Sequence, residues 1–149
     1  PLLVALVEMK RCVVKLDRKK AEKKAERWQT IALGAAKQSK RMQIPTVHMP
    51  VTFQQALAMI AESDVRLMPY ENAEGMEGTR KILESIEPGE SIAILIGPEG
   101  GIDEAEVEMA MKEKVEPITL GKRILRTETA GMTVLSILVY LLEGRERTR

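Results

Sequence analysis

The chain has 149 residues, 44% hydrophobic and 30% charged, with a formal net charge of +1, which predicts one compact globular domain. A single cysteine, Cys12, excludes an internal disulfide and suits a reducing compartment. No stretch reaches the roughly 18 apolar residues of a membrane span, and the apolar N-terminal run is too short for a secretory signal. We therefore expect a cytoplasmic protein that does not enter a membrane.

The small net charge hides a strong asymmetry along the chain. Residues 10–41 contain twelve Lys or Arg and three acids, whereas residues 62–116 contain five basic and fifteen acidic residues. A basic segment on a nearly neutral protein indicates a polyanionic partner such as nucleic acid. Ordinary solvated helices rich in Lys and Glu give the same pattern, so charge alone leaves both interpretations open.

Short β-rich runs alternate with helical patterns, which predicts an α/β domain with a mostly parallel sheet flanked by helices. The run "SIAILI" lacks alternation and is expected to be a central strand covered on both faces. In chain order, the expected strands cover residues 2–7, 11–16, 44–49, 65–69, 91–96 and 117–121.

Helices are expected between most of these strands. The spacing of Ala21, Ala25, Trp28 and Ile31 predicts a long amphipathic helix within residues 17–41. Further helices are expected over residues 53–62, behind a Thr52/Gln55 capping box, and over residues 78–86. Another should begin after Asp103, with Glu106 completing a second capping box. Residues 130–142 are apolar nearly all round and predict a buried core helix.

The stretch "LIGPEGGIDE" places three glycines and a proline between a buried strand and a helix. Glycine permits positive φ or a close approach to the backbone, and ligands collect at the carboxyl ends of strands in open α/β sheets. No phosphate-loop pattern is present, and Glu99 would repel phosphate. Such a turn is more often structural, so a second element has to decide its role.

That second element is "LGKRILRTETAG", which joins the strand expected at residues 117–121 to the C-terminal helix. One interpretation of Thr127 or Thr129 is a plain helix N-cap. Arg126 and Glu128, next to a buried helix, need either each other or a ligand.

Together, "IGPEGG", "LGKRILRTETA" and "ERWQTIALGAAKQSKR" resemble the ribosomal RNA small subunit methyltransferase E family, of the SPOUT superfamily. The resemblance covers most of residues 7–143. It implies a SPOUT-type α/β fold with a deep C-terminal trefoil knot, and a homodimer with cofactor sites near the subunit interface. It also implies S-adenosylmethionine as methyl donor and N3 of a uridine in 16S ribosomal RNA, on the small ribosomal subunit, as acceptor.

In this family three loops of the knot hold the cofactor, and the reactive sulfonium makes a metal unnecessary. Leu120, Ile124, Leu125 and the backbones of Gly97 and Gly121 fit an apolar slot for adenine. Carried onto this sequence, the cofactor-binding residues are Met68, Pro69, Ile96, Gly97, Gly101, Leu120, Gly121, Ile124, Leu125, Arg126, Thr129 and Ala130.

The implied chemistry assigns two catalytic roles. Uridine N3 must lose its proton before it attacks the methyl group, so Arg126 is expected to position uridine and stabilise the developing anion. Glu128 orients Arg126 or the cofactor, and a role as direct base is the weaker alternative. Lys37, Gln38, Ser39 and Arg41 match a Gln-Ser-Gly-Arg segment of the family, with Lys40 in the glycine position, and together with Arg126 they are the expected RNA-binding residues.

The sequence also departs from its relatives. The N-terminal PUA-like barrel of the family has no counterpart here, so residues 1–149 are expected to form the catalytic domain alone. The first two expected strands follow one another almost directly, although a parallel crossover needs a dozen or more residues. The first βαβ unit is therefore expected to be incomplete near residues 6 and 7. Two alternatives remain: another target, such as ribose 2′-O or guanine N1, or a catalytically incompetent fragment that only binds RNA or dimerises.

Overall fold

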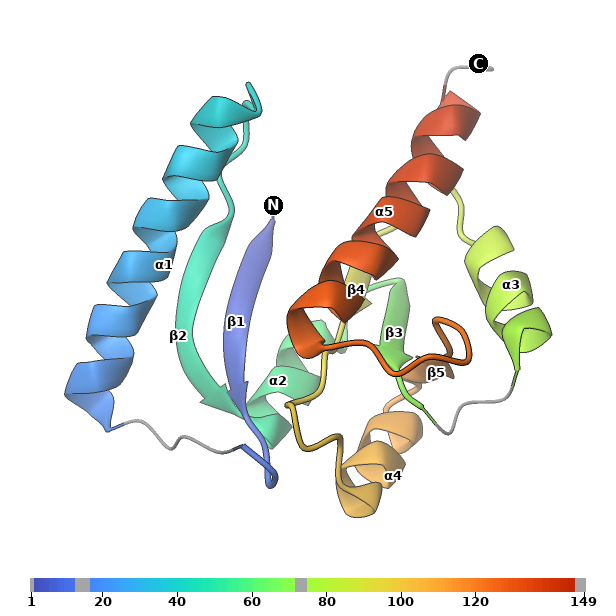
Figure 1. Cartoon of the computed structure of the whole chain (residues 1–149), viewed down its shortest axis with the longest axis horizontal. Helices are drawn as coiled ribbons and strands as arrows, with labels where there is room; N and C mark the ends of the chain where they lie inside the picture. Colours follow the sequence, from blue (N-terminus) through green and yellow to red (C-terminus); the bar gives the residue numbers. More distant parts are fainter. Residues whose placement is uncertain (1, 13–16, 72–74, 147–149) are drawn as a thin grey trace.

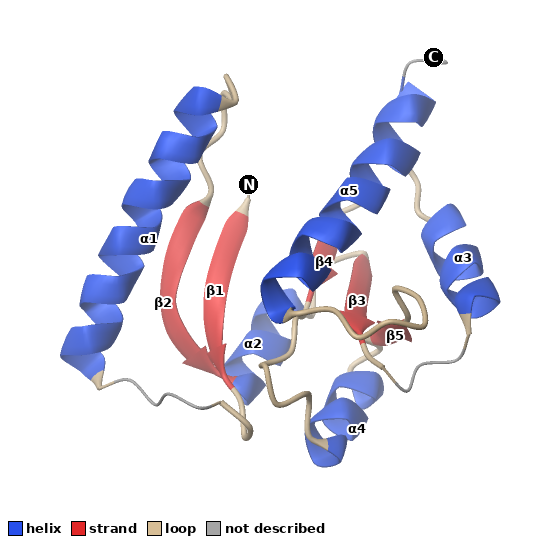
Figure 2. Ribbon diagram, viewed as in Figure 1, coloured by secondary structure: helices blue, strands red, loops and turns tan. Residues whose placement is uncertain are grey.

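The computed structural model describes residues 2–12, 17–71 and 75–146. It contains two parallel sheets with helices around them (Figures 1 and 2), one of two strands in the order β1–β2 and one of three strands in the order β4–β3–β5. The elements are β1 (Leu3–Glu8), α1 (Arg18–Gln38), β2 (Thr46–Thr52), α2 (Phe53–Ile60), β3 (Val65–Pro69), α3 (Met76–Glu84), β4 (Ile92–Ile94), α4 (Glu104–Lys112), β5 (Glu116–Ile118) and α5 (Thr127–Glu146). The predicted α/β class with parallel pairing and flanking helices is confirmed.

The first unit of the fold is β1, α1 and β2. β1 runs without a break through residues 6 and 7, with a register shift between Ala5 and Val7 where it pairs with β2. The strand expected over residues 11–16 is wrong for Arg11 and Cys12, because Cys12 N donates to the Met9 carbonyl at 3.1 Å and closes a turn there. Residues 13–16 lie outside the described part of the chain.

α1 begins and packs largely as its pattern predicts. Asp17 caps it by accepting a hydrogen bond from Lys20 N at 2.9 Å. Ala21 and Ala25 are buried, but Ile31 is 56% exposed, so the predicted apolar face is only partly covered. Gln29 fixes the helix to the neighbouring chain, because its side-chain amide donates to the Pro45 carbonyl and its oxygen accepts from Val47 N.

β3 is the central strand of the three-stranded sheet, and two consecutive residues face its two sides. Leu67 belongs to one hydrophobic cluster, with Ile118 and Val134. Met68 belongs to the other, with Phe53 and Ile102. Both side chains are fully buried, as successive residues are in a strand that is covered on both faces.

The prediction that "SIAILI" is the central strand is therefore wrong. Its strand, β4, lies at one end of the described three-stranded sheet and pairs with β3 alone. Burial on both faces misled the prediction, because Ile94 packs on one hydrophobic cluster and Leu95 belongs to the other. An apolar run reports that helices cover a strand but not whether another strand pairs with each edge.

One of the two predicted capping boxes forms. Thr52 and Gln55 make the reciprocal pair at the start of α2. Asp103 caps α4 through Ala105 N, but Glu106 does not return to the Asp103 backbone. Instead, Glu106 Oε2 accepts a hydrogen bond at 3.2 Å from Lys10 N, which follows β1. A partner distant in the sequence thus replaces the local one.

α5 begins at Thr127 and covers one side of the three-stranded sheet, where Val134 and Leu138 are buried. The prediction that the helix is buried nearly all round is wrong for its opposite face. Met132, Leu135, Val139 and Tyr140 are at least half exposed there. Among the described helices, none is long and apolar enough to cross a membrane.

Candidate active site

Three loops, each following a strand of the three-stranded sheet at its carboxyl end, line an open cavity of about 920 Å³ together with the start of α5. The loops follow β3, β4 and β5, and the third leads directly into α5 (Figure 1). Because the strands are parallel, their carboxyl ends meet at one edge of the sheet, where the sequence placed the candidate site.

Most residues expected to bind a cofactor come together at this cavity. All of them line it except Met68, which is fully buried in a hydrophobic cluster, and Thr129. Ile96 and Gly97 line the cavity from one loop, and residues 120–125 line it from another. The expected residues that line it are Pro69, Ile96, Gly97, Gly101, Leu120, Gly121, Ile124, Leu125, Arg126 and Ala130.

The glycines of these loops are required for two different physical reasons. A Cβ on Gly97 would lie 2.5 Å from Cγ1 of the buried Ile102, so this position has no room for a side chain. Gly101 and Gly121 instead adopt positive φ, at 80° and 116°, which L-residues rarely adopt. Glycine is therefore needed at Gly97 and Gly101 in the turn after β4 and at Gly121 in the loop after β5. All three residues line the cavity.

The first residue of α5 is tied to the glycine turn. Thr127 Oγ1 donates a hydrogen bond to the Gly97 carbonyl at 3.1 Å, although 30 positions separate the two residues in the chain. A role for Thr127 only as an N-cap was one open alternative. Its hydroxyl links two walls of the cavity, which the sequence alone did not reveal.

The two expected catalytic residues both line the cavity, and both side chains are exposed. Of the two alternatives for Arg126 and Glu128, pairing with each other or contact with a ligand, the first is not observed, because no ion pair joins them among the described residues. Both charged groups keep their hydration and remain available to a ligand in the cavity.

The expected cofactor-binding residues did not include several lining residues of the same three loops. Tyr70 and Glu71 follow β3, and Lys122 and Arg123 lie inside the third loop. Glu99, whose role was open, also lines the cavity and is exposed. The signal that could have found them is their position between residues already assigned to the same three loops.

The expected RNA-binding residues at the end of α1 do not belong to this site. Lys37, Gln38, Ser39 and Arg41 are all exposed and lie around the C-terminal end of α1. In Figure 1 that end is far from the loop that precedes α5. The structure therefore brings only Arg126, of the residues expected to contact RNA, to the cavity.

The composition of the cavity wall suits an amphipathic, zwitterionic ligand. Ile96, Leu120 and Leu125 offer an aliphatic surface, and Glu71, Glu99 and Glu128 provide carboxylates. Cationic groups come from Lys122, Arg123 and Arg126. A cavity of this volume lies within the usual range for small-molecule sites, about 300–1,000 Å³. Within the described residues, no three His, Cys, Asp or Glu side chains cluster in a way that could hold a metal ion.

Comparison with known proteins agrees with this arrangement. The family model described as an RNA methyltransferase domain matches residues 3–139. The chain therefore belongs to the RNA methyltransferase family that this model defines.

Individual proteins similar to this chain include ribosomal RNA methyltransferases and structures with a bound cofactor. A ribosomal RNA small subunit methyltransferase E from Bacillus subtilis is 43% identical over 136 residues, 89% of this chain and 53% of the relative. A structure of the Neisseria gonorrhoeae protein of that name, bound to S-adenosyl methionine, is 32% identical with a TM-score of 0.78 and covers 95% of this chain and 55% of its own. A Legionella pneumophila putative methyltransferase bound to the same cofactor is 31% identical with a TM-score of 0.82, over 93% and 55% of the two chains. The chain spans about half the length of these relatives.

Proposed function

We propose that residues 1–149 form the catalytic domain of a methyltransferase that transfers a methyl group from S-adenosylmethionine to N3 of a uridine in 16S ribosomal RNA. The observation that carries the proposal is the single cavity built from the "GPEGG" turn and the "LGKRILRTETA" segment. Two relatives of this chain are described as bound to S-adenosyl methionine, which supports the same cofactor here.

The cavity fits this cofactor by its chemistry. Leu120, Ile124 and Leu125 give an apolar surface for adenine, and Gly97 and Gly121 line the same cavity without a side chain. Arg123 can pair with the carboxylate of the methionine part. Glu71 or Glu99 can pair with its ammonium group or lie near the sulfonium.

When bound, the cofactor supplies an electrophilic methyl group. The protein residues therefore need to orient uridine and to assist the removal of its N3–H proton. The N3–H proton must leave before the nitrogen lone pair can form a bond to the methyl carbon. Arg126, at the cavity and exposed, can donate hydrogen bonds to the uracil oxygens that carry the negative charge after deprotonation. Glu128, two residues on, forms no ion pair with Arg126 among the described residues; it would orient that guanidinium once ligands occupy the cavity, or accept the proton through water.

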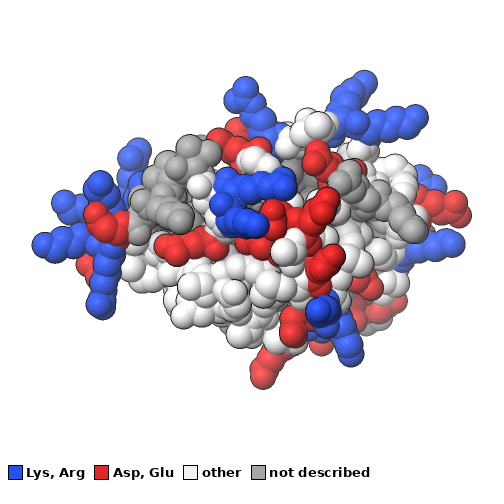
Figure 3. Space-filling model, turned by 90° about the horizontal axis from the view of Figure 1, so that it is seen from below, with Lys and Arg blue, Asp and Glu red and all other residues white. Residues whose placement is uncertain are grey.

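A basic surface supports ribosomal RNA as the substrate. Figure 3 shows a group of basic side chains at the end of the molecule that α1 forms, and basic and acidic side chains mixed over the rest of that face. The basic group at α1 agrees with the sequence, in which residues 10–41 hold twelve basic residues. Phosphates of the RNA would bind along α1 and at Lys37 and Arg41 near its C-terminal end, while the target base enters the cavity.

The exposed face of α5 supports a homodimer. Met132, Leu135, Val139 and Tyr140 place apolar surface in water along about two and a half turns of one helix, and Tyr140 is 81% exposed. A second copy would cover this face, and α5 borders the cavity, which agrees with cofactor sites near a subunit interface. The charge-introducing variant Tyr140→Glu is expected to shift the protein to monomer in sedimentation velocity, while a monomeric wild type would contradict the proposal.

We further propose that the chain has the SPOUT-type trefoil knot that the resemblance implies. The order β4–β3–β5 supports it, because β4 and β5 lie on opposite edges of β3 and the chain that connects them has to pass β3. The bond between Thr127 and Gly97, which ties the segment entering α5 to an earlier loop, also supports it. A crystal structure with S-adenosylmethionine would test the knot, the site and the dimer together.

Two measurements test the proposed activity. Isothermal titration calorimetry should detect S-adenosylmethionine binding, and the absence of binding at millimolar ligand would overturn the enzyme proposal in favour of a module that only binds RNA or dimerises. Incubation with small ribosomal subunits and labelled cofactor, followed by mass spectrometry of the nucleosides, should yield N3-methyluridine. A ribose methyl or N1-methylguanosine would keep the methyltransferase but reject the uridine target.

A further inference from the structure

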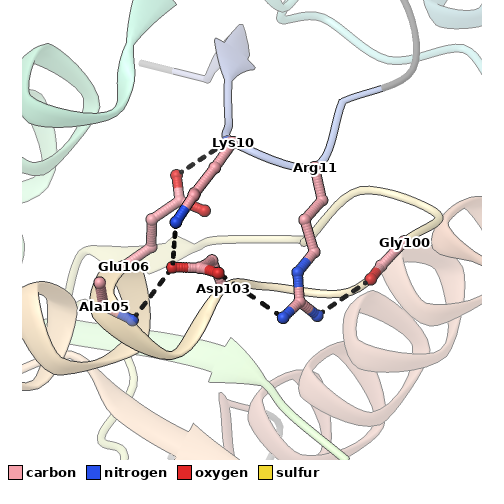
Figure 4. A network of polar contacts seen from close by, with 6 residues as sticks. All are labelled: Lys10, Arg11, Gly100, Asp103, Ala105 and Glu106. Carbon is pink, nitrogen blue, oxygen red and sulfur yellow. Dashed lines mark hydrogen bonds and ion pairs between the residues drawn. The ribbon is translucent and has the colours of Figure 1, made fainter.

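The turn that follows β1 holds the glycine turn of the cavity from outside (Figure 4). Arg11 Nη1 donates a hydrogen bond to the Gly100 carbonyl at 3.3 Å, and Nη2 of the same guanidinium lies 3.6 Å from Asp103 Oδ1. These contacts join positions 89 and 92 residues apart in the chain. The planar Arg11 guanidinium thus contacts both the glycine turn and Asp103, the N-cap of α4.

The backbone of the same residue packs against the turn. A Cβ on Gly100 would lie 3.3 Å from both Cβ and the carbonyl oxygen of Arg11. The Arg11 Nη1 atom is 3.6 Å from the position that a Cβ on Gly101 would take. Arg11 therefore packs directly against the glycine turn at Gly100 and Gly101.

Lys10 also contacts the segment that follows the glycine turn, but its side chain contributes less than that of Arg11. Lys10 N donates to the buried Glu106 carboxylate, and Lys10 Nζ lies 3.4 Å from Asp103 Oδ2. The Lys10 side chain is 70% exposed, whereas that of Arg11 is 47% exposed and makes the added bond to Gly100. Exposed ion pairs contribute little, so of the two side chains Arg11 holds the turn more firmly.

We propose that Arg11 is a positioning residue for the methyl-donor site. Gly100 and Gly101 line the cavity, whereas Arg11 does not, so Arg11 acts through the turn and not by touching the ligand. Its two contacts fix the turn in the shape that lines the cavity before ligand binding, which removes an ordering cost from binding. The inference rests on the proposed function, because it takes S-adenosylmethionine as the ligand of this cavity.

The test compares three variants of the full chain by calorimetry with S-adenosylmethionine. Arg11→Ala is expected to raise the Kd about threefold to tenfold. Arg11→Lys keeps the charge but not the planar fork and should recover only part of the affinity. Arg18→Ala is the matched control, because it also removes one arginine-carboxylate pair, to Glu22 on the exposed surface of α1, and should leave the Kd unchanged.

The outcomes separate the inference from the proposed function. A purely structural role for Arg11 would lower the melting temperature and the number of binding sites per protein, but it would not change the Kd of the folded fraction. Equal Kd values for Arg11→Ala and Arg18→Ala would overturn the positioning role while wild-type binding still supports the proposed function. Loss of binding in the wild type would instead reject the proposed function itself.

Discussion

Thr127 Oγ1 donates a hydrogen bond to the Gly97 carbonyl at 3.1 Å, so the first residue of α5 is tied to the glycine turn that follows β4. Both residues line the cavity. This bond fixes the distance between two walls of the site that are built from different parts of the chain.

We expect Thr127→Val to lower the free energy of unfolding by about 1 kcal/mol, because the part-buried Gly97 carbonyl loses its donor while the side-chain volume is kept. Thr127→Ser keeps the hydroxyl and should lose less. Thermal unfolding followed by circular dichroism measures the difference. Equal melting temperatures for the Val and Ser variants would show that the bond contributes nothing.

Gly97→Ala should destabilise the protein by about 1–3 kcal/mol, because the added Cβ forces the buried Ile102 side chain to move. Gly78→Ala in α3 is the matched control, since nothing lies within 4 Å of its Cβ position. Replacing glycine inside a helix should stabilise by about 0.5–1 kcal/mol. Urea unfolding of both variants gives the two free energies, and a stable Gly97→Ala protein would contradict the close packing.

Under the proposed function, Arg126→Ala should fold and bind S-adenosylmethionine within about twofold of the wild type, since its guanidinium is exposed and acts on uridine. We expect kcat to fall about 100-fold, as when a donor to a developing anion is removed. Arg123→Ala removes the same charge from the same cavity and should raise the Kd for cofactor instead. Near-normal turnover by Arg126→Ala would remove this residue from the mechanism.

Lys40→Gly should stabilise the protein by about 1 kcal/mol, because Lys40 has φ of 55° directly after the end of α1. The bonds Lys40 N to Lys37 O and Arg41 N to Ala36 O form the helix-ending motif that favours glycine at this position. Lys37→Gly removes the same charge inside the helix and should destabilise by about 1 kcal/mol. The two melting temperatures should therefore move in opposite directions.

Asp64 gives the protein a pH dependence at low pH. The backbone N–H and hydroxyl of Ser91 both donate to its carboxylate at 2.8 Å, and these bonds hold the pKa of Asp64 below its ordinary value of 3.8. A pKa lowered by folding adds stability above pH 3.8, and this contribution is lost as the pH falls through the lower pKa of the folded state. The melting temperature of the wild type minus that of Asp64→Asn should therefore shrink between pH 5 and pH 2. A constant difference would contradict the assignment.

Local sequence patterns predicted most of the elements and the place of the site. The Thr52/Gln55 box, the Asp103 cap and the glycine-rich loops were all recognisable because the residues that make them are neighbours in the chain. The three loops could be assigned to one cavity because parallel strands align their carboxyl ends.

Partners distant in the sequence explain what the patterns missed. Glu106 was assigned to a local box but binds Lys10 N, and Arg11 was assigned to a strand but holds Gly100. Met68 was expected to bind the cofactor because it lies near the end of β3, but the pleat of the strand turns its side chain into the core. The apolar pattern of α5 likewise could not show which of its faces the rest of the chain would leave uncovered.

α5 connects three parts of the proposed function. Its first residue bonds to the cavity wall, its exposed face includes Val139, and near its far end Arg145 donates to the Glu84 and Ile86 carbonyls at the end of α3. In the proposed dimer, a shift of α5 upon association would also displace the partner of Gly97. Association and cofactor affinity then share one thermodynamic cycle, so whatever factor the second copy applies to cofactor binding, the cofactor applies equally to dimerisation.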